Sequence, residues 1–441
     1  PAARYDYYGA YAPPGSGWRL GKGAPDHVPA HEAHLYNKLL EGELTFDWSR
    51  SFEFVAQECR AARVGAALFD TSYFGKLELR GPRADAAMQW LCAADLEAKR
   101  PGSVTYTPLC NVRGGVEADM TVTKLADDAW YLVTGGATKS RDLRWIVEAL
   151  EAGGFDVADV ALTDVSEQRA ILSVQGPLSH ALLSPLVDGH AIDDLDAFPF
   201  STAREVAVMG VGGVRCLRLT FVGELGFELH LPAADAARVY EAVRAAGEEL
   251  SQETGVPVCD AGYFALDSLS AEKSYRHWHS DLGVADNPME AGIGFSTVPK
   301  LKREDMPRFM GGDALRQQRK TGLQRRLVTL VLDAPGGPAG AALPLHGGES
   351  MLRNGKCVGH VRSTAFGHTL GRTIATGYVE CPKDLPKITP TWLHAGNWAV
   401  SSRLMPPMPA TLFLKPPFDP DGKRIRNQYE DELLALNAMR P

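Results

Sequence analysis

A repeated unit of strand, Gly-Pro turn and helix is the feature of this sequence that most constrains its fold. A β-forming run over 74–80 leads through Gly81 and a proline into a helical segment over 84–91. The same order returns over 169–186, where Gly176 and a proline form the turn. A repeated supersecondary unit predicts two related α+β lobes, and such lobes commonly enclose a crevice where ligands bind.

Each unit continues in the same way, which strengthens the prediction of a repeat. A Gly-Gly-Val sequence begins at Gly114 and again at Gly212, and two short β runs follow each of them. Amphipathic helices are then expected over 139–152 and 233–250, where apolar residues recur at helical spacing. We therefore predict that residues 46–310 form two intertwined α+β lobes.

The segments on either side of the lobes have a different composition. Residues 1–45 are rich in Gly, Pro and Tyr and predict an irregular N-terminal arm. Residues 311–441 show strand signals between Gly and Pro turns, which predict a small barrel-like β domain and a tail. The strand signals lie at 327–332, 357–362, 373–379 and 398–402. The expected fold class is α+β, with a C-terminal β-barrel-like domain.

Composition excludes several classes of function. The chain has 441 residues, 45% of them hydrophobic, and its net charge of -8 argues against a general nucleic-acid binder. Its longest apolar runs are far shorter than the roughly 20 residues that cross a bilayer, and no leader opens the sequence. Seven scattered cysteines without a Cys-x-x-Cys pair indicate reduced thiols. We expect a cytoplasmic protein that contacts neither nucleic acid nor membrane.

Familiar cofactor and nucleophile motifs are missing. No Gly-x-Gly-x-x-Gly opens a helix after a strand, so no flavin or nicotinamide site is expected in this chain. A Gly-x-Ser-x-Gly elbow and a phosphate loop are also missing. The histidines and cysteines lack the spacing of a zinc site, so no metal site is expected.

A carboxylate in the run Asn111–Val122 is the first candidate for chemistry. Val116, Ala118, Met120 and Val122 share one parity, whereas Asp119 lies on the other parity with polar residues. Asp119 therefore points away from the core of its own sheet. The pattern leaves two interpretations open, a solvated face or a group that meets a ligand.

Two further segments carry candidate residues. Glu228 lies between Phe227 and Leu229 just after a glycine turn, so it is either the outward residue of a strand or a carboxylate that reaches into the crevice. Tyr275, His277 and Trp278 follow a helical segment; they could frame a substrate or only pack at the helix end.

Together these segments resemble the aminomethyltransferase family, which includes the T-protein of glycine cleavage. The resemblance is strongest to the folate-binding C-terminal half of sarcosine and dimethylglycine dehydrogenases. It covers nearly the whole chain in order. The matching segments are Tyr5–Tyr11, Phe69–Lys76, Asn111–Val122, Phe198–Thr202, Phe221–Leu229, Tyr275–Asp281 and Phe418–Pro420.

The resemblance implies a cloverleaf of three domains around a central cavity that holds tetrahydrofolate. Asp119 matches the catalytic aspartate of the family, and Glu228 matches the glutamate that binds the pterin ring. Phe221, Tyr73 and Phe74 are expected among the residues that contact the cofactor. Phe221, Gly135 and Leu266 replace a folate-contacting Tyr, Asn and Arg of the T-protein, and Phe264 replaces an Arg of the sarcosine dehydrogenase branch.

The resemblance further implies a tetrahydrofolate-dependent one-carbon transferase. It would act on an N-methyl amine such as sarcosine or dimethylglycine, or on the derived iminium or formaldehyde, and form methylene-tetrahydrofolate. A separate flavin-containing dehydrogenase subunit would then be a partner. Alternatives are direct methyl transfer from a small N-, S- or O-methyl donor, lined by Tyr275, His277 and Trp278, and a folate-binding or regulatory subunit without chemistry.

Overall fold

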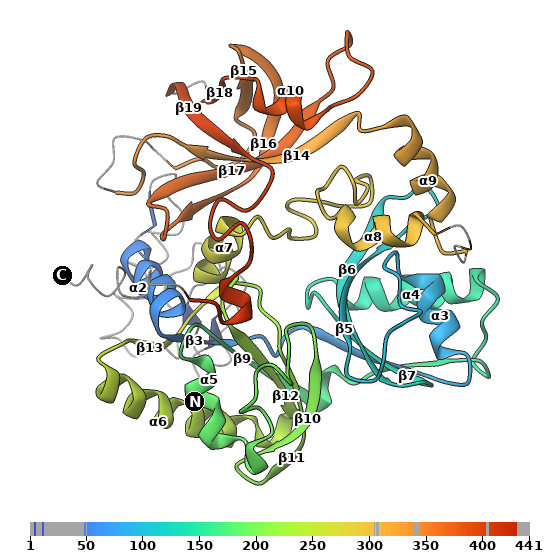
Figure 1. Cartoon of the computed structure of the whole chain (residues 1–441), viewed down its shortest axis with the longest axis vertical. Helices are drawn as coiled ribbons and strands as arrows, with labels where there is room; N and C mark the ends of the chain where they lie inside the picture. The colour runs from blue at the N-terminus through green and yellow to red at the C-terminus, as the bar shows by residue number, and fades with distance from the viewer. Residues whose placement is uncertain are drawn as a thin grey trace, which may run out of the picture.

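The computed structural model describes residues 4–5, 11–12, 48–49 and 51–429, apart from 304, 306–307, 339–343 and 403–404. Most of the predicted N-terminal arm over 1–45 lies outside the described residues, which include only the paired strands β1 (Arg4–Tyr5) and β2 (Tyr11–Ala12). Figure 1 shows a β-barrel at the top and two α+β lobes beneath it, one at the lower left and one at the right.

The first lobe is a five-stranded sheet with the order β5-β6-β7-β4-β8. One face is covered by α3 and α4, and the core there contains Leu77, Leu79, Met120, Val122 and Leu132. Apolar side chains at alternate positions make this face, because successive residues of a strand point to opposite sides. The elements are β4 (Gly75–Arg80), α3 (Ala84–Leu91), β5 (Val104–Cys110), β6 (Val116–Ala126), β7 (Ala129–Thr134), α4 (Lys139–Ala152) and β8 (Ala161–Asp164).

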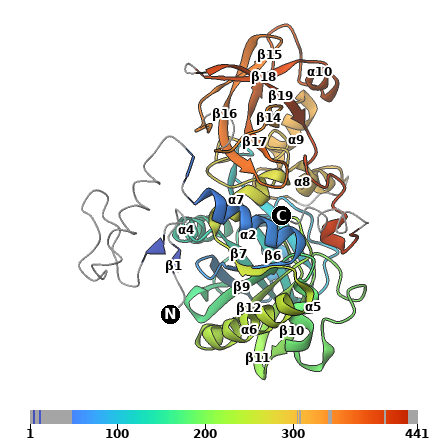
Figure 2. The ribbon, with the colours of Figure 1, turned by 90° about the vertical axis from the view of Figure 1, so that its left-hand side faces the viewer.

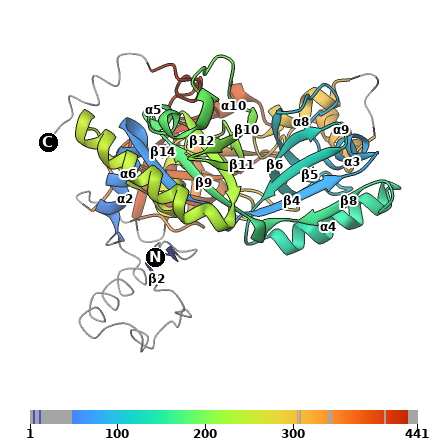
Figure 3. The same cartoon turned by 90° about the horizontal axis from the view of Figure 1, so that it is seen from below.

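The second lobe is a six-stranded sheet with the order β10-β11-β12-β9-β3-β13. Helices α5 and α6 cover its apolar face, and Figure 3 shows α6 lying along the outside of the lobe. The elements are β3 (Ala66–Asp70), η1 (Ser166–Gln168), β9 (Arg169–Gln175), α5 (Ser179–Leu183), η2 (Ser184–Leu186), η3 (Asp188–His190), β10 (Ala203–Val208), β11 (Val211–Leu217), β12 (Gly226–Pro232), η4 (Ala233–Asp235), α6 (Ala236–Thr254) and β13 (Val258–Asp260).

The two lobes share one topology. The strands β5-β6-β7-β4 of the first lobe and β10-β11-β12-β9 of the second have the same order. Both turn glycines have a positive φ, 149° at Gly81 and 130° at Gly176. A Cβ atom would lie 2.2 Å from the Asp159 carbonyl oxygen at Gly81 and 2.4 Å from the Gly65 carbonyl oxygen at Gly176. The repeated turn therefore needs glycine for both its conformation and its close packing.

The C-terminal body is a closed barrel of six strands with the order β14-β17-β16-β15-β18-β19. This closed barrel confirms the predicted α+β class with a C-terminal β-barrel-like domain. Helices α9 and α10, which the strand signals did not predict, also lie in this part of the chain. The strands are β14 (Arg325–Leu332), β15 (Ser350–Arg353), β16 (Lys356–Gly367), β17 (Arg372–Glu380), β18 (Trp398–Ser402) and β19 (Met405–Phe413). The helices are α9 (Gly312–Thr321) and α10 (Pro390–His394).

A buried ion cluster joins the second lobe, the barrel and the end of the described chain. Arg63 donates to Glu224 and to Glu272, both at 2.8 Å, and Arg424 donates to Glu224 at 2.8 Å. Glu272 also accepts a hydrogen bond from the backbone of Thr369 in the barrel. Figure 2 shows α2 and α7 between the barrel and the lobes. The elements involved are α2 (Phe52–Val64), α7 (Tyr263–Glu272) and η5 (Arg424–Arg426); α8 (Gly294–Leu301) lies further along the chain.

No helix within the described ranges is long and apolar enough to cross a bilayer.

Candidate active site

The two sheets turn their polar faces toward each other. On β6, Val116, Ala118, Met120 and Val122 are buried in the apolar face, whereas Asp119 on the opposite face is partly exposed. On β12 of the second lobe, Phe227 and Leu229 are fully buried, and Glu228 retains 15% of its side-chain exposure. Contacts between the polar faces join the lobes. Asp119 and Glu228 therefore belong to the sheet faces that the two lobes turn toward each other.

Asp119 has an environment that favours its protonated form. Burial raises the pKa of Asp119 to about 6, although Tyr106 and His277 act in the opposite direction. The Tyr106 hydroxyl donates a hydrogen bond to Asp119 Oδ2 at 2.8 Å. Tyr106 comes from β5, the neighbouring strand, where it pairs with Thr121. A carboxylate with a pKa near 6 is mostly ionised at pH 7 and still basic enough to accept a proton.

The segment after α7 brings His277 to the same region. The His277 ring meets the edge of Phe221 with 4.9 Å between ring centroids, and Phe221 lies 5.8 Å from the ring of Tyr275. His277 Nε2 lies 3.1 Å from Ser270 Oγ and 3.8 Å from a carboxylate oxygen of Asp267. The next residue, Trp278, hydrogen-bonds the start of β6, the strand that carries Asp119. The structure thus gathers Asp119, Phe221, Tyr275 and His277 from separate parts of the sequence.

Trp278 has a different position. Its indole N–H donates to the Val116 carbonyl at 3.0 Å, and its ring lies under the Arg141 guanidinium at 4.7 Å. Its apolar neighbours include Leu282 and Ile293. Trp278 therefore anchors the 275–281 segment to the start of β6, the strand that carries Asp119.

Glu228 is held by its own lobe. His230 Nε2 lies 3.1 Å from Glu228 Oε2, and Ser173 of β9 is the direct partner of Glu228 across the sheet. Two residue pairs further along, the buried Gln175 donates its amide to Ser173 and to Leu219, while its Oε1 has no hydrogen-bond donor in the described part of the chain. The face thus carries a partly exposed carboxylate, with a buried amide acceptor beneath it.

Tyr73 and Phe74 lie together at the end of β3. Tyr73 is 42% exposed and meets the edge of Tyr263 at 5.3 Å. Phe74 packs against the small apolar cluster that includes Tyr131 and Ile171. The Phe74 side chain is thus part of the contact between the lobes, whereas Tyr73 keeps a surface on which a ligand ring could stack.

Several site residues carried no signal in the sequence. Tyr106 is an ordinary tyrosine in a strand, and His230 and Gln175 are single polar residues in β-forming runs. Only the register between strands shows that Gln175 lies beside the Glu228 pair and that Tyr106 reaches Asp119. Strand alternation applied to β9 and β12 would have placed Gln175, Glu228 and His230 on polar faces, but not next to each other.

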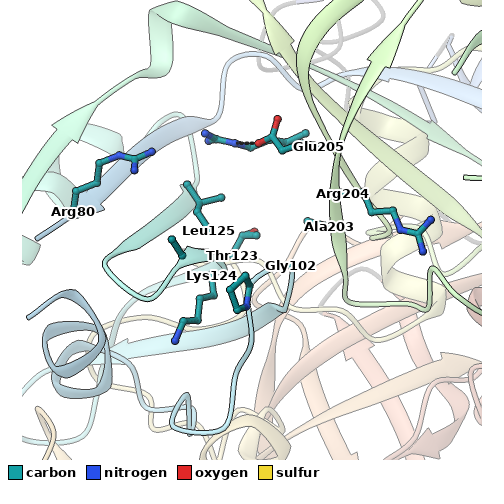
Figure 4. Close-up of a pocket in the computed structure, with 11 residues that line it drawn as sticks. Arg80, Gly102, Thr123, Lys124, Leu125, Ala203, Arg204 and Glu205 are labelled. Carbon is teal, nitrogen blue, oxygen red and sulfur yellow. Dashed lines mark hydrogen bonds and ion pairs between the residues drawn. The ribbon is translucent and has the colours of Figure 1, made fainter. Parts of the chain in front are cut away.

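A separate cavity of about 450 Å³ lies between the lobes. Its lining comes from β4 and β6 of the first lobe and from β10 and β11 of the second, as Figure 4 shows. Three of the four lining cations have acidic partners: Arg80 pairs with Glu78, and Arg215 pairs with Glu205 at 2.8 Å. Lys124 likewise pairs with an aspartate at 2.6 Å. The fourth lining cation, Arg204, has no acidic partner among the described residues and donates to the backbone carbonyls of Ala191 and Ala197.

Comparison with known proteins assigns the family. Residues 8–300 match the GCVT N-terminal domain, and residues 325–419 match the C-terminal barrel domain of the glycine cleavage T-protein. The chain is 40% identical over 438 residues to mitochondrial sarcosine dehydrogenase of Mus musculus, covering 96% of this chain and 43% of that enzyme. It is 33% identical over 355 residues to an aminomethyltransferase of Symbiobacterium thermophilum, covering 80% of this chain and 88% of that enzyme.

A solved structure supports the same fold. The glycine cleavage aminomethyltransferase T of Bartonella henselae superimposes with a TM-score of 0.66 over 82% of this chain and 89% of that chain, at 22% identity. The chain belongs to the aminomethyltransferase family of the glycine cleavage T-protein, a family of folate-dependent transferases. The chain spans less than half the length of the sarcosine dehydrogenases that it matches.

Proposed function

We propose that this chain transfers a one-carbon unit to tetrahydrofolate bound between the two lobes. The observation that carries the proposal is Asp119, a partly exposed carboxylate whose pKa is raised to about 6 by burial, on a polar sheet face turned toward the other lobe. A raised pKa at such a position is typical of a group that handles protons. The membership in a folate-dependent family supplies the acceptor.

The residues have separate roles in this proposal. Asp119 accepts the proton that the folate nitrogen releases when its bond to carbon forms, and Tyr106 holds the carboxylate in place. Glu228 accepts hydrogen bonds from the pterin edge. Tetrahydrofolate, when bound, supplies the nitrogen that takes up the carbon. Phe221 and Tyr73 offer ring surfaces to the cofactor, and His277 and Tyr275 line the side of the donor.

The donor follows from the relatives. Because the sarcosine dehydrogenases are the relatives at 40% identity, we propose an N-methyl amine of the sarcosine or dimethylglycine type as the source of the carbon. A flavin-containing dehydrogenase partner oxidises the amine to an iminium, or releases formaldehyde, and this chain forms methylene-tetrahydrofolate. This division of labour is supported by the matched segments, since this chain matches 88% of an aminomethyltransferase and 43% of a sarcosine dehydrogenase.

A product assay tests the proposal. The purified chain is mixed with tetrahydrofolate and either formaldehyde or a panel of N-, S- and O-methyl donors, and the folate product is identified by mass. We expect methylene-tetrahydrofolate from formaldehyde, faster than without protein, and a large loss of this acceleration in Asp119→Asn. Methyl-tetrahydrofolate formed without any flavin protein would instead establish direct methyl transfer. Folate binding without acceleration would establish a non-catalytic binding subunit.

A further inference from the structure

The polar contact between the lobes contains a chain of three side chains that ends at Glu228. The Tyr131 hydroxyl, from β7 of the first lobe, lies 3.0 Å from Nδ1 of His230 on β12. His230 Nε2 lies 3.1 Å from Glu228 Oε2. Tyr131 and His230 are both fully buried, whereas Glu228 keeps 15% of its side-chain exposure. The buried end of this hydrogen-bonded series, Tyr131, therefore lies in the first lobe, and its partly exposed end, Glu228, lies in the second lobe.

The chemistry of the three groups defines where their protons are. Burial lowers the pKa of His230, despite the opposing effect of Glu228, so the imidazole is neutral near pH 7. A neutral imidazole has one N–H donor and one acceptor nitrogen, and an ionised carboxylate only accepts. Nε2 must therefore carry the proton and donate to Glu228. Nδ1 is left as the acceptor, and the Tyr131 hydroxyl donates to it.

We propose that His230 is a positioning residue for folate binding, with its tautomer set by Glu228 and its ring held in place by Tyr131 of the other lobe. The inference rests on the proposed binding of the pterin by Glu228. One oxygen of Glu228 is held by His230 Nε2–H, which leaves the other oxygen directed for the ligand. In the tautomer in which Nδ1 carries the proton, Nε2 would turn its lone pair toward the Glu228 carboxylate. The hydrogen bond that holds Glu228 would then be lost. The contact between the lobes thus sets the geometry of the anchor.

Neighbouring contacts restrict the chain further. The Arg215 guanidinium lies over the Tyr131 ring at 4.7 Å, and Arg215 is itself the cross-strand partner of His230. Arg215 also bridges the lobes through its ion pair with Glu78 at 2.8 Å. The Tyr131 ring is therefore held between charged and aromatic neighbours, and its hydroxyl has little freedom to leave His230. This restriction holds the His230 ring in place.

Binding measurements test the role of His230. The dissociation constant of 5-formyltetrahydrofolate is measured by calorimetry for the wild type, His230→Gln, His230→Leu and Tyr131→Phe. A glutamine retains a donor near the Nε2 position, so we expect His230→Gln to bind within about threefold of the wild type and His230→Leu about tenfold more weakly. Tyr131→Phe is expected to weaken binding about threefold. In a Glu228→Gln background the effect of His230→Leu should be lost.

A control variant separates a structural defect from the proposed role. His180→Leu removes a histidine that stacks on Phe227, on the apolar side of the same strand, and should leave the dissociation constant unchanged at a similar cost in melting temperature. If His230→Leu bound folate as tightly as the wild type and Glu228→Gln bound it more weakly, the inference about His230 would be overturned. The proposed function would not be affected. Failure of the wild type to bind any folate would overturn the proposed function.

The tautomer has a readout that needs no folate. Long-range ¹H–¹⁵N spectra of the histidine-labelled protein identify which ring nitrogen carries the proton, and comparison with His230→Gln assigns the signal of His230. We expect the Nε2–H form in the wild type and also in Tyr131→Phe, because the Glu228 carboxylate still accepts from Nε2. A wild-type signal with the proton on Nδ1, or a charged ring at pH 7, would refute the proposed chain of hydrogen bonds.

Discussion

The raised pKa of Asp119 predicts that removal of its charge stabilises the protein, and that the gain depends on pH. Folding moves the pKa of Asp119 from its ordinary value of 3.8 to about 6, so the fold favours the protonated form. That contribution is fully present below about pH 4 and is lost as the pH rises through 6. In the wild type, the ionised carboxylate therefore weakens folding at neutral pH. Asp119→Asn has no charge there and escapes this penalty.

The size of the gain follows from linkage. Each pKa unit corresponds to about 1.4 kcal/mol, so the full penalty is about 3 kcal/mol at pH 8 and about half of that at pH 5. Partial solvent contact of Asp119 makes these figures upper bounds. The unfolding free energy of Asp119→Asn exceeds that of the wild type, and this excess should therefore grow by at most about 1.5 kcal/mol between pH 5 and pH 8.

Urea unfolding at pH 5, 6, 7 and 8 measures this gain for the wild type and the variant side by side. Asp128→Asn is the matched control, because Asp128 is an exposed carboxylate in the turn after the same strand and should give a difference that does not vary with pH. A stability difference between Asp119→Asn and the wild type that is constant from pH 5 to pH 8 would refute the raised pKa. The assignment of Asp119 as proton acceptor would then lose its physical basis.

Three further predictions concern the site and the fold. Tyr106→Phe removes a hydrogen bond that lowers the pKa of Asp119, so the acid limb of the kcat/KM profile should move above its wild-type position near pH 6. Arg63→Met leaves the fully buried Glu272 without its cation and should lower the unfolding free energy by about 3–5 kcal/mol in urea, whereas the exposed Arg144→Met should change it little. Gly81→Ala should cost about 2 kcal/mol or more because its Cβ would meet a backbone oxygen at 2.2 Å, whereas Gly212→Ala, with open space around it, should be tolerated when both are compared by melting temperature.

Local patterns predicted most of the secondary structure. The helix expected over 139–152 is α4, and the two-residue alternation of Asn111–Val122 gave the polar face of β6 on which Asp119 lies. Four strand signals in the C-terminal region correspond to β14, β16, β17 and β18. Strand β19 carried no such signal, because its prolines lack the N–H that a ladder uses. It forms here as a barrel strand that pairs with β14 and β18.

The sequence by itself determined the repeated turns, the faces of the strands and, through family resemblance, the expected ligand. Only the tertiary structure decided which side chains meet. It places Tyr106 on Asp119, His277 against Phe221 and Tyr131 on His230. The last contact joins residues 99 positions apart in the chain. Strand periodicity fixes the direction in which a side chain points, because it is a local property of the backbone. The partner that a side chain finds depends on how two sheets pack, which no local pattern contains.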